Sequence, residues 1–454
     1  MPALNVWMNG EYVGEWLTGR SATATFTYAK EWLDSPSVRA LSLSIPITAT
    51  REVKGPQVNN YFDNLLPDNP NIRNRVRDRL GLRSSDAFDL LEAIGRDCVG
   101  AVQILPPTEI PTQPAQIDAE RLTEQDVARL LAKVTSARPL GGLRSDDDDF
   151  RISIAGAQEK TALLYLSGSW HRPKKATPTT HILKLPLGVI GNFQGDFSHS
   201  VENEWLCAKF LTSVGLTTAD TEMATLEGQR VLVVRRFDRR WVGVDPEQAE
   251  AAGYVPKAGH WIARLPQEDF CQATGRSPLR RYEADGGPSS DEILEILGQS
   301  SDAAADRRRF VLAQLVFWLL AATDGHGKNF SIGHRAGNEF SLTKLYDVLS
   351  AWPIIGPGRN QLPYPDAQLA MAVCGKNRHY RIGEIHARHF HLLMTRVGGT
   401  ELWQAACDLV ESAPKKLQQL VDSLPPDFPE VVATKITKGV ADQSQRFLHA
   451  AAHL

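Results

Sequence analysis

The sequence predicts an α+β protein in two lobes, the first rich in strands and the second mostly helical. Short apolar stretches of strand-like composition dominate residues 150–235, whereas helical periodicity prevails from residue 265 to the C-terminus. Residues 310–323 are apolar almost all round, which is typical of a helix buried in a core. At 454 residues, the chain is long enough for about three domains.

The composition is that of an ordinary globular protein, with 42% hydrophobic and 23% charged residues. Because the net charge is −3, any nucleic-acid contact must come from a local patch. The five cysteines are odd in number and form no C-x-x-C pair, which predicts reduced thiols and a cytoplasmic location. We see no secretion signal or membrane span and expect no membrane partner.

The N-terminal part begins with Asn9-Gly10 between two short strand-like runs, the strongest local signal for a hairpin. Residues 42–46 alternate like a strand and stop at a proline. A basic helix is expected over residues 72–80 and should close at Gly81. The proline-rich residues 106–114 then mark a linker.

Thr123 can cap a helix expected over residues 121–134. Residues 150–165 alternate on both sides of Ala155-Gly156-Ala157, which predicts a strand, a tight loop and a second strand. Successive small residues let backbone N–H groups approach a phosphate. An ordinary hairpin turn is the alternative.

A single lysine, Lys184, interrupts the apolar strand expected over residues 180–186, and among buried neighbours it needs an anionic partner. A nucleotide phosphate would serve, as would Glu204 on the helix expected over residues 201–214. Another strand begins near residue 230, and in a nucleotide-binding interpretation its end meets the adenine. Residues 239–240 should then form only an exposed arginine-rich end.

The loop Asp324-Gly325-His326-Gly327-Lys328-Asn329 follows the apolar helix directly. Burying such polar groups unpaired would cost roughly 1–3 kcal/mol each, so they should face a cleft or a ligand. Asp324 and Asn329 are separated by the five-residue step found in the kinase loop H-R-D-x-x-x-x-N. With Asp347, they would form a catalytic base and a magnesium site; a helix C-cap and turn is the alternative.

Lys376, Arg378 and Arg381 make a short basic patch. A solvated loop is one interpretation of this patch, and contact with the phosphate backbone of DNA is the other.

Seven motifs lie at residues 7–10, 61–68, 94–97, 153–160, 236–239, 265–269 and 322–329. Together they resemble motifs of the bacterial HipA toxins, and the resemblance extends over nearly the whole chain. The resemblance implies a two-lobed protein-kinase-like fold and an ATP- and magnesium-dependent serine/threonine protein kinase. Such a kinase is the toxin of a type II module, with a helix-turn-helix antitoxin, HipB, that binds operator DNA. An aminoacyl-tRNA synthetase would be its substrate, and growth arrest and persistence its effect.

The resemblance also implies roles for single residues. Asp324 matches the catalytic aspartate, Asn329 and Asp347 the magnesium-side residues, and Ser153 the serine that is autophosphorylated. Arg235 stands where a glutamate is expected, so adenine binding survives only if the backbone makes that contact. The implied ATP-binding residues are Ile154, Ala155, Gly156, Ala157, Gln158, Glu159, Lys160, Lys184, Arg235, Phe237, His326, Lys328 and Asn329.

We expect the chain to divide into four segments. These are an N-terminal α/β domain (residues 1–110), a linker with a helix (111–148), a nucleotide-binding strand-rich lobe (149–265) and a helical lobe with the catalytic loop (266–454). Two other functions stay open. One is a corepressor whose kinase has decayed, which the intact Asp324, Asn329, Asp347 and Lys184 disfavour. The other is a small-molecule or lipid kinase, because Asp-x-His-x-x-Asn also resembles phosphoinositide kinases.

Overall fold

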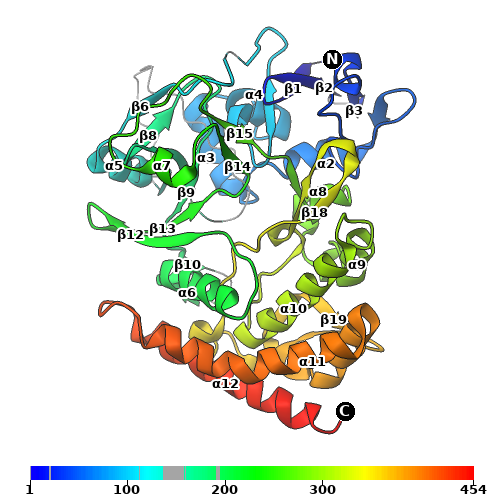
Figure 1. The fold of residues 1–454 in the computed structure, drawn as a ribbon, viewed down its shortest axis with the longest axis vertical. Helices are drawn as coiled ribbons and strands as arrows, with labels where there is room; N and C mark the ends of the chain where they lie inside the picture. Colours follow the sequence, from blue (N-terminus) through cyan, green and yellow to red (C-terminus); the bar gives the residue numbers. More distant parts are fainter. Residues whose placement is uncertain (1, 20–21, 112, 136–157, 159, 191–194) are drawn as a thin grey trace. The chain divides into compact units, whose positions relative to one another are not determined.

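The structure, a computed structural model, describes residues 2–19, 22–111, 113–135, 158, 160–190 and 195–454. The chain forms two compact units, each assembled from three separate stretches of sequence. Both units mix helices and strands, which confirms the α+β class (Figure 1). The four predicted segments are not tested by this division and stay a prediction. Unit 1 is Met1–Leu185, Ala224–Leu279 and Ile332–Phe340; unit 2 is Pro186–Met223, Arg280–Ser331 and Ser341–Leu454.

The first sheet of unit 1 has the strand order β4-β3-β2-β1-β5, and all neighbours are antiparallel. The predicted Asn9-Gly10 hairpin joins β1 to β2, and both turn residues have positive φ (50° and 89°), as a two-residue hairpin turn requires. The strands β1 to β5 are Ala3–Met8, Glu11–Gly19, Ala22–Tyr28, Glu52–Lys54 and Val102–Leu105.

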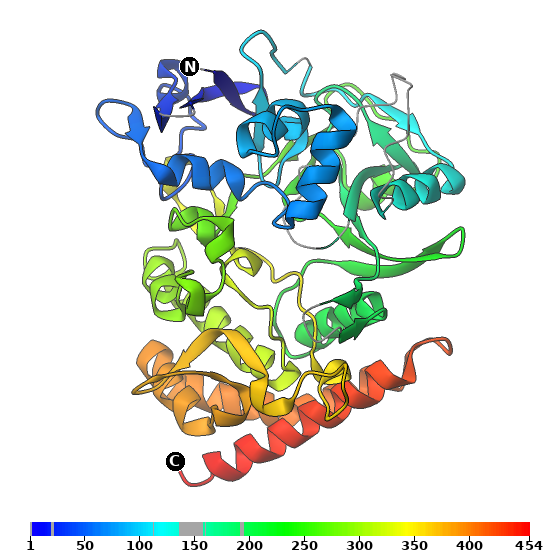
Figure 2. The ribbon, with the colours of Figure 1, turned by 180° about the vertical axis from the view of Figure 1, so that it is seen from behind.

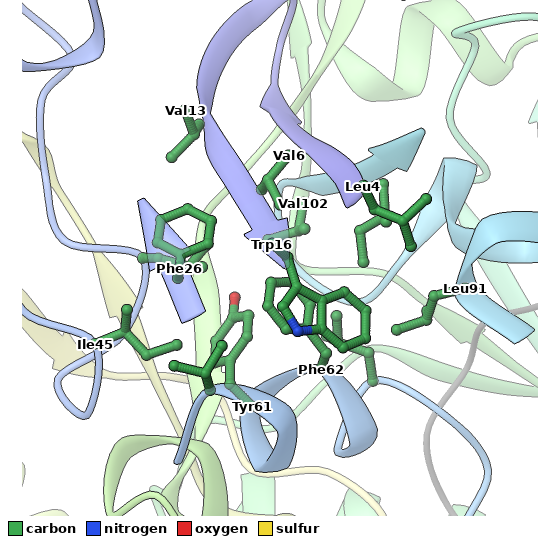
Figure 3. Packing of buried hydrophobic residues seen from close by; sticks show 14 of the residues in the cluster. Leu4, Val6, Val13, Trp16, Phe26, Ile45, Tyr61, Phe62, Leu91 and Val102 are labelled. Carbon is green, nitrogen blue, oxygen red and sulfur yellow. The ribbon is translucent and has the colours of Figure 1, made fainter. Parts of the chain in front are cut away.

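A large aromatic core covers one face of this sheet (Figure 3). Trp16 of β2 stacks on Phe62, with ring centroids 4.0 Å apart, and Tyr61 meets Phe62 edge-on. Alternation along β1 turns Leu4 and Val6 into the same core. The helices of this region are α1 (Lys30–Leu33), α2 (Pro56–Asp63), α3 (Pro70–Leu80), α4 (Ala87–Ile94) and the 3-10 turn η1 (Gly95–Asp97).

Two local predictions have opposite outcomes in this region. Helix α3 ends as predicted at Gly81, which takes the left-handed conformation (φ 63°). The strand predicted over residues 42–46 is wrong, because Ser42 and Ile45 form only an isolated bridge. The hydroxyls of Ser42 and Ser44 bond to the Gln272 carbonyl and to each other, and such side-chain bonds compete with strand pairing.

The second sheet has the order β12-β13-β9-β7-β8-β6. Successive residues of β7 point to opposite faces, so Leu163 packs in the core that includes Leu131 of α5, and Leu164 packs in the core that includes Trp241 and Ile262. Thr123 caps α5 as predicted. These elements are β6 (Ala119–Arg121), α5 (Glu124–Thr135), β7 (Lys160–Leu166), β8 (Ser169–Pro173), β9 (His181–Lys184), β12 (Thr221–Leu226) and β13 (Gln229–Arg235).

Shorter elements complete unit 1, among them the pair β14 and β15 and the sheet β16-β17-β18. Strands β12, β17 and β18 and the turn η2 each include the point where the chain passes from one unit to the other. The elements are β14 (Arg239–Val242), α7 (Pro246–Glu250), β15 (Trp261–Arg264), β16 (Gln267–Asp269), α8 (Phe270–Ala273), η2 (Pro278–Arg280), β17 (Ser331–His334), η5 (Ala336–Asn338) and β18 (Phe340–Leu342).

Unit 2 is mostly helical. Its long helices α11 and α12 lie side by side in both views (Figure 1 and Figure 2), and α10 packs against them. Among the described residues, no helix is both long and apolar enough to cross a membrane. The elements are β10 (Gly188–Ile190), β11 (Gly195–Phe197), α6 (Ser200–Ser213), η3 (Glu283–Asp285), α9 (Ser290–Leu297), α10 (Ala303–Leu320), η4 (Gly327–Asn329), η6 (Trp352–Ile354), η7 (Tyr364–Asp366), β19 (Gln368–Cys374), β20 (Arg378–Arg381), η8 (Ile382–Glu384), α11 (Ala387–Val421) and α12 (Glu430–Ala451).

Candidate active site

The end of helix α10 supports the candidate catalytic loop. Every residue from Phe310 to Leu320 is buried, which confirms the prediction of a core helix. Ala321 ends the helix in the left-handed conformation (φ 49°), and the Ala322 N–H donates to the Phe317 carbonyl over 2.8 Å. The loop therefore starts from a firmly packed end.

Asp324 is the first charged residue after this helix, and its side chain is 55% exposed. The hydroxyl of Tyr282 donates a hydrogen bond to its Oδ1, and His326 Nε2 lies 3.7 Å from the same oxygen. Burial raises the pKa of Tyr282 well above its usual value, and the negative charge of Asp324 raises it further. The hydroxyl therefore stays protonated and remains a donor. The carboxylate can still accept a proton on Oδ2 from an incoming hydroxyl.

Asn329 is buried at the end of η4 and bonded to the same loop. Its side-chain Nδ2 donates to the Asp324 carbonyl over 2.6 Å, and its backbone N–H donates to the His326 carbonyl over 2.9 Å. Because the amide nitrogen is committed to the loop, the amide oxygen is the atom suited to a hard cation. His326 and Lys328 are buried in this loop as well.

Two glycines let the loop lie close to its surroundings. A Cβ atom at Gly325 would lie 2.5 Å from the ring of Phe317, and one at Gly327 would lie 2.7 Å from Pro288. Any side chain at either position would push the loop away from α10 or from the segment before α9.

Asp347 lies in a second segment fixed to the end of α10. Its backbone has φ 59°, a region that aspartate enters more often than most residues, and its side chain is half-buried. Three residues later, the Ser350 hydroxyl donates to the Leu320 carbonyl over 2.6 Å, and the Ser350 N–H donates to Asn203 Oδ1 over 2.9 Å. A sparsely populated backbone conformation held by such anchors is common at functional sites.

In unit 1, Lys184 is buried in β9 and stands directly opposite Lys160 of β7. Residues opposite each other in an antiparallel pair share one face, so the two lysine side chains leave the sheet on the same side. Gln158 donates its side-chain amide to the Leu185 carbonyl, next to Lys184. Ser153, Ile154, Ala155, Gly156, Ala157 and Glu159 lie outside the described residues.

At the end of strand β13, which is proposed to contact adenine, several groups already have partners within the protein. Arg235 forms an ion pair with Glu250 of α7, and the Arg236 N–H donates to the Thr180 carbonyl over 2.9 Å. Phe237 is half-buried. An adenine contact at this end would therefore have to use backbone groups other than the Arg236 N–H.

A buried charge cluster follows this strand. Arg236, Arg239 and Arg264 contact the carboxylate of Asp97 at 3.4, 3.0 and 3.0 Å. Burial alone would raise the pKa of Asp97, but the three guanidinium groups lower it far below its usual value. The prediction that residues 239–240 form an exposed end is wrong for Arg239, which is buried because it pairs with Asp97, a residue distant in the sequence. Arg240 is exposed, as predicted.

The basic patch of unit 2 lies on the β19–β20 hairpin. Lys376 is exposed, Arg378 lies 3.5 Å from Glu283, and Arg381 lies 3.3 Å from Glu384. Both partners of the Arg381–Glu384 pair are more than half exposed, so water weakens this ion pair and Arg381 can exchange it for a contact with phosphate. Arg378 is 59% exposed, but its partner Glu283 is buried.

Sequence reasoning missed two parts of this chemistry, Tyr282 and the cluster around Asp97. Tyr282 is 42 residues from Asp324, and no local pattern signals their contact. The Gly286-Gly287 turn that follows Tyr282 was the one available hint of a tightly placed segment.

Two family profiles match this chain: the HipA N-terminal domain over residues 4–105 and the HipA-like C-terminal domain over residues 152–426. "Putative kinase Y4mE" of Sinorhizobium fredii is 32% identical over 78% of this chain and 79% of its own length. The serine/threonine-protein kinase toxin HipA of Shewanella oneidensis is 25% identical over 71% of this chain and 69% of its own length.

A solved structure supports the fold. The complex of the Shewanella oneidensis toxin–antitoxin system HipA, HipB and its operator DNA contains a chain that matches 99% of this one, with 98% of that chain covered. The TM-score is 0.77 and the sequence identity is 21%. A similarity at this identity establishes the fold.

Proposed function

The chain belongs to the HipA family, and from this we propose that it is an ATP-dependent serine/threonine protein kinase, the toxin of a type II toxin–antitoxin module. One observation carries the proposal: Asp324 is an exposed carboxylate at the end of a buried helix, and Asn329, five residues later, is bonded to its carbonyl. The kinase catalytic loop uses this pair of residues at this spacing.

In the proposed reaction, Asp324 accepts the proton of a serine hydroxyl on the protein substrate. The serine oxygen forms a bond to the γ-phosphorus of ATP, the bond from that phosphorus to the β–γ bridging oxygen breaks, and ADP leaves. Lys184, with Lys160 opposite it, would contact phosphate oxygens through charge-assisted hydrogen bonds. His326, Lys328 and the segment 154–160 would complete the phosphate contacts, and Arg235 and Phe237 would lie at the adenine.

Asn329 and Asp347 are the proposed magnesium ligands, which would supply an amide oxygen and a carboxylate from anchored backbone. When bound, the ion would neutralise charge on the phosphate oxygens. Support for Mg²⁺ is that both proposed ligand atoms are oxygens, which this hard cation prefers.

An aminoacyl-tRNA synthetase is the proposed substrate, and growth arrest with persistence the proposed outcome; the family resemblance supports both. Ser153 is the proposed site of autophosphorylation. A phosphate there would add a charge of roughly −1.5 to −2 beside the segment 154–160 and repel ATP. Mass spectrometry after incubation with ATP should find phospho-Ser153 in a form that binds ATP more weakly.

A HipB-like helix-turn-helix antitoxin and, through it, operator DNA are the proposed partners. The solved HipA, HipB and operator DNA complex of the relative supports both. Lys376, Arg378 and Arg381 would then contact DNA phosphates. Neutralising one of them should reduce the salt slope of operator binding by about one unit, and an unchanged slope would assign the patch to solvent.

The decisive experiment measures transfer of labelled γ-phosphate to protein by Asp324→Asn and Asp347→Asn. Each should lose about 10²- to 10⁴-fold in turnover. Asp220→Asn is the matched control, because Asp220 is a 67% exposed acid of the same unit and forms an exposed ion pair with Lys344 at 3.3 Å. Wild-type turnover in the Asp324 variant would refute the assignment, and label in a small molecule or lipid instead of protein would favour the other kinase class.

A further inference from the structure

Tyr282 stands out among the residues around Asp324, because its hydroxyl donates directly to the Asp324 carboxylate. Both contacts of that carboxylate, from Tyr282 and from His326, fall on Oδ1. An exposed aspartate would otherwise sample several orientations, and phosphoryl transfer depends on the orientation of the accepting oxygen. A donor on Oδ1 restricts these orientations and leaves Oδ2 as the oxygen that can accept a proton.

The backbone on both sides of Tyr282 is held in place. The Arg281 carbonyl accepts from the Gly327 N–H of the catalytic loop over 3.2 Å. On the other side, the buried carboxylate of Glu283 accepts from the Ala372 N–H of β19 over 2.8 Å. The segment therefore connects the catalytic loop to a core strand of unit 2.

The ring of Tyr282 is also fixed. His326 meets it edge-on, with ring centroids 5.0 Å apart, and the Arg281 guanidinium lies 5.1 Å from the ring centre on one face. A phenol has few rotatable bonds, so contacts on two sides leave its hydroxyl little freedom.

We propose that Tyr282 is a positioning residue of the phosphoryl-transfer site, which holds Asp324 so that Oδ2 faces the hydroxyl of the protein substrate. This inference rests on the proposed kinase function. A competing role is that of an internal acceptor, in which the Tyr282 hydroxyl itself receives the phosphate. The anchored backbone argues against that role, because an acceptor must move toward the nucleotide.

The test compares wild type with Tyr282→Phe, which removes only the hydroxyl. Labelled ATP is the donor and myelin basic protein the acceptor, and kcat, the KM for ATP and the melting temperature are measured. We expect kcat to fall about tenfold to hundredfold, with the KM for ATP within about twofold and the melting temperature within about 1 °C. A purely structural role would lower the melting temperature instead.

Tyr364→Phe is the matched control. The Tyr364 hydroxyl accepts from Arg446 over 3.0 Å and has no contact with Asp324 among the described residues, so its loss should leave kcat unchanged. In the double variant Tyr282→Phe with Asp324→Asn, kcat should equal that of Asp324→Asn alone, because Tyr282 acts only through this carboxylate.

A Tyr282→Phe variant with the kcat of wild type, or a higher one, would overturn the inference, and so would phosphate on Tyr282 in the mass spectrum. The proposed function fails in a different way. If wild type transfers no phosphate, or if Asp324→Asn transfers it as fast as wild type, both the kinase assignment and this inference fall together.

Discussion

Asp97 of unit 1 and Asp324 of unit 2 are both aspartates held by residues distant in the sequence, but their surroundings are opposite. The Asp97 side chain is 2% exposed and meets three arginines. The Asp324 side chain is 55% exposed and receives one hydroxyl donor on one oxygen. The first carboxylate is buried among compensating charges, whereas the second is more than half exposed and its described contacts fall on one oxygen.

This difference separates a charge that holds the fold from a charge that can do chemistry. Removing one partner of a buried ion cluster leaves the others uncompensated, so Asp97 should matter for stability. An exposed carboxylate contributes little to stability, so Asp324 should matter for turnover. Both expectations can be measured separately.

The largest effect is expected from Asp97→Asn. The substitution keeps the shape but removes the carboxylate that Arg236, Arg239 and Arg264 share. Asp238 still contacts Arg236 and Arg239, so the buried uncompensated charge falls mainly on Arg264, which should cost about 3–5 kcal/mol in the free energy of unfolding. Chemical denaturation measures it, with the exposed Asp34→Asn as control. A loss below about 1 kcal/mol would show that the cluster contributes little to the stability of the fold.

A fall in pH should lower the stability of unit 1 through its buried titratable groups. Burial and, to a lesser extent, the positive charge of the nearby Arg235 lower the pKa of His181 to about 3, from about 6.5 in an unfolded chain. Between these two values the unfolded chain binds a proton that the folded chain does not, so stability falls as the pH drops from about 6.5 to about 3. Below about pH 4, protonation of Asp97 in the unfolded chain adds to the loss.

Denaturation midpoints measured from pH 7 to pH 3 test this expectation. His181→Phe should flatten the upper part of the curve, since a phenyl ring can keep the edge-on contacts that His181 makes with Tyr165 and Trp170. Parallel curves for the variant and wild type would mean that another group titrates in this range.

Several elements could be predicted from the sequence because their signals are local. The Asn9-Gly10 turn, the Gly81 helix end and the apolar helix before Asp324 each depend on neighbouring residues alone. Asp324 and Asn329 were proposed because both lie in one six-residue loop, and the structure brings them together. The roles assigned to them remain proposals.

The remaining features depend on contacts between distant residues. Asp97 and Arg239 are 142 residues apart, so no window of sequence could show that Arg239 turns inward. Helix α11 continues through Pro414 to Val421, although proline removes a helix hydrogen bond, whereas Gly398 and Gly399 interrupt it with non-helical backbone.

Gly325→Ala should lower both the free energy of unfolding and the turnover, whereas each of the two aspartates should affect mainly one of them. The new Cβ atom would lie 2.5 Å from the Phe317 ring, so the loop must shift, at a cost of about 1–3 kcal/mol in stability. The shift would carry Asp324 with it, and turnover should fall as well. If stability falls but turnover does not, the loop position is less critical for the reaction than the contacts suggest.

The smallest change in stability is expected from Asp324→Asn. Asparagine keeps an oxygen that can accept from the Tyr282 hydroxyl, and the exposed side chain has no buried charge to leave unpaired. Surface substitutions of this kind usually change the free energy of unfolding by no more than about 0.5 kcal/mol. Phosphoryl transfer should nevertheless be almost abolished, because an amide cannot act as the base. Denaturation and transfer assays on the same preparation give both numbers. A loss of several kcal/mol would show that Asp324, like Asp97, serves the fold, and the contrast between the two aspartates would then disappear.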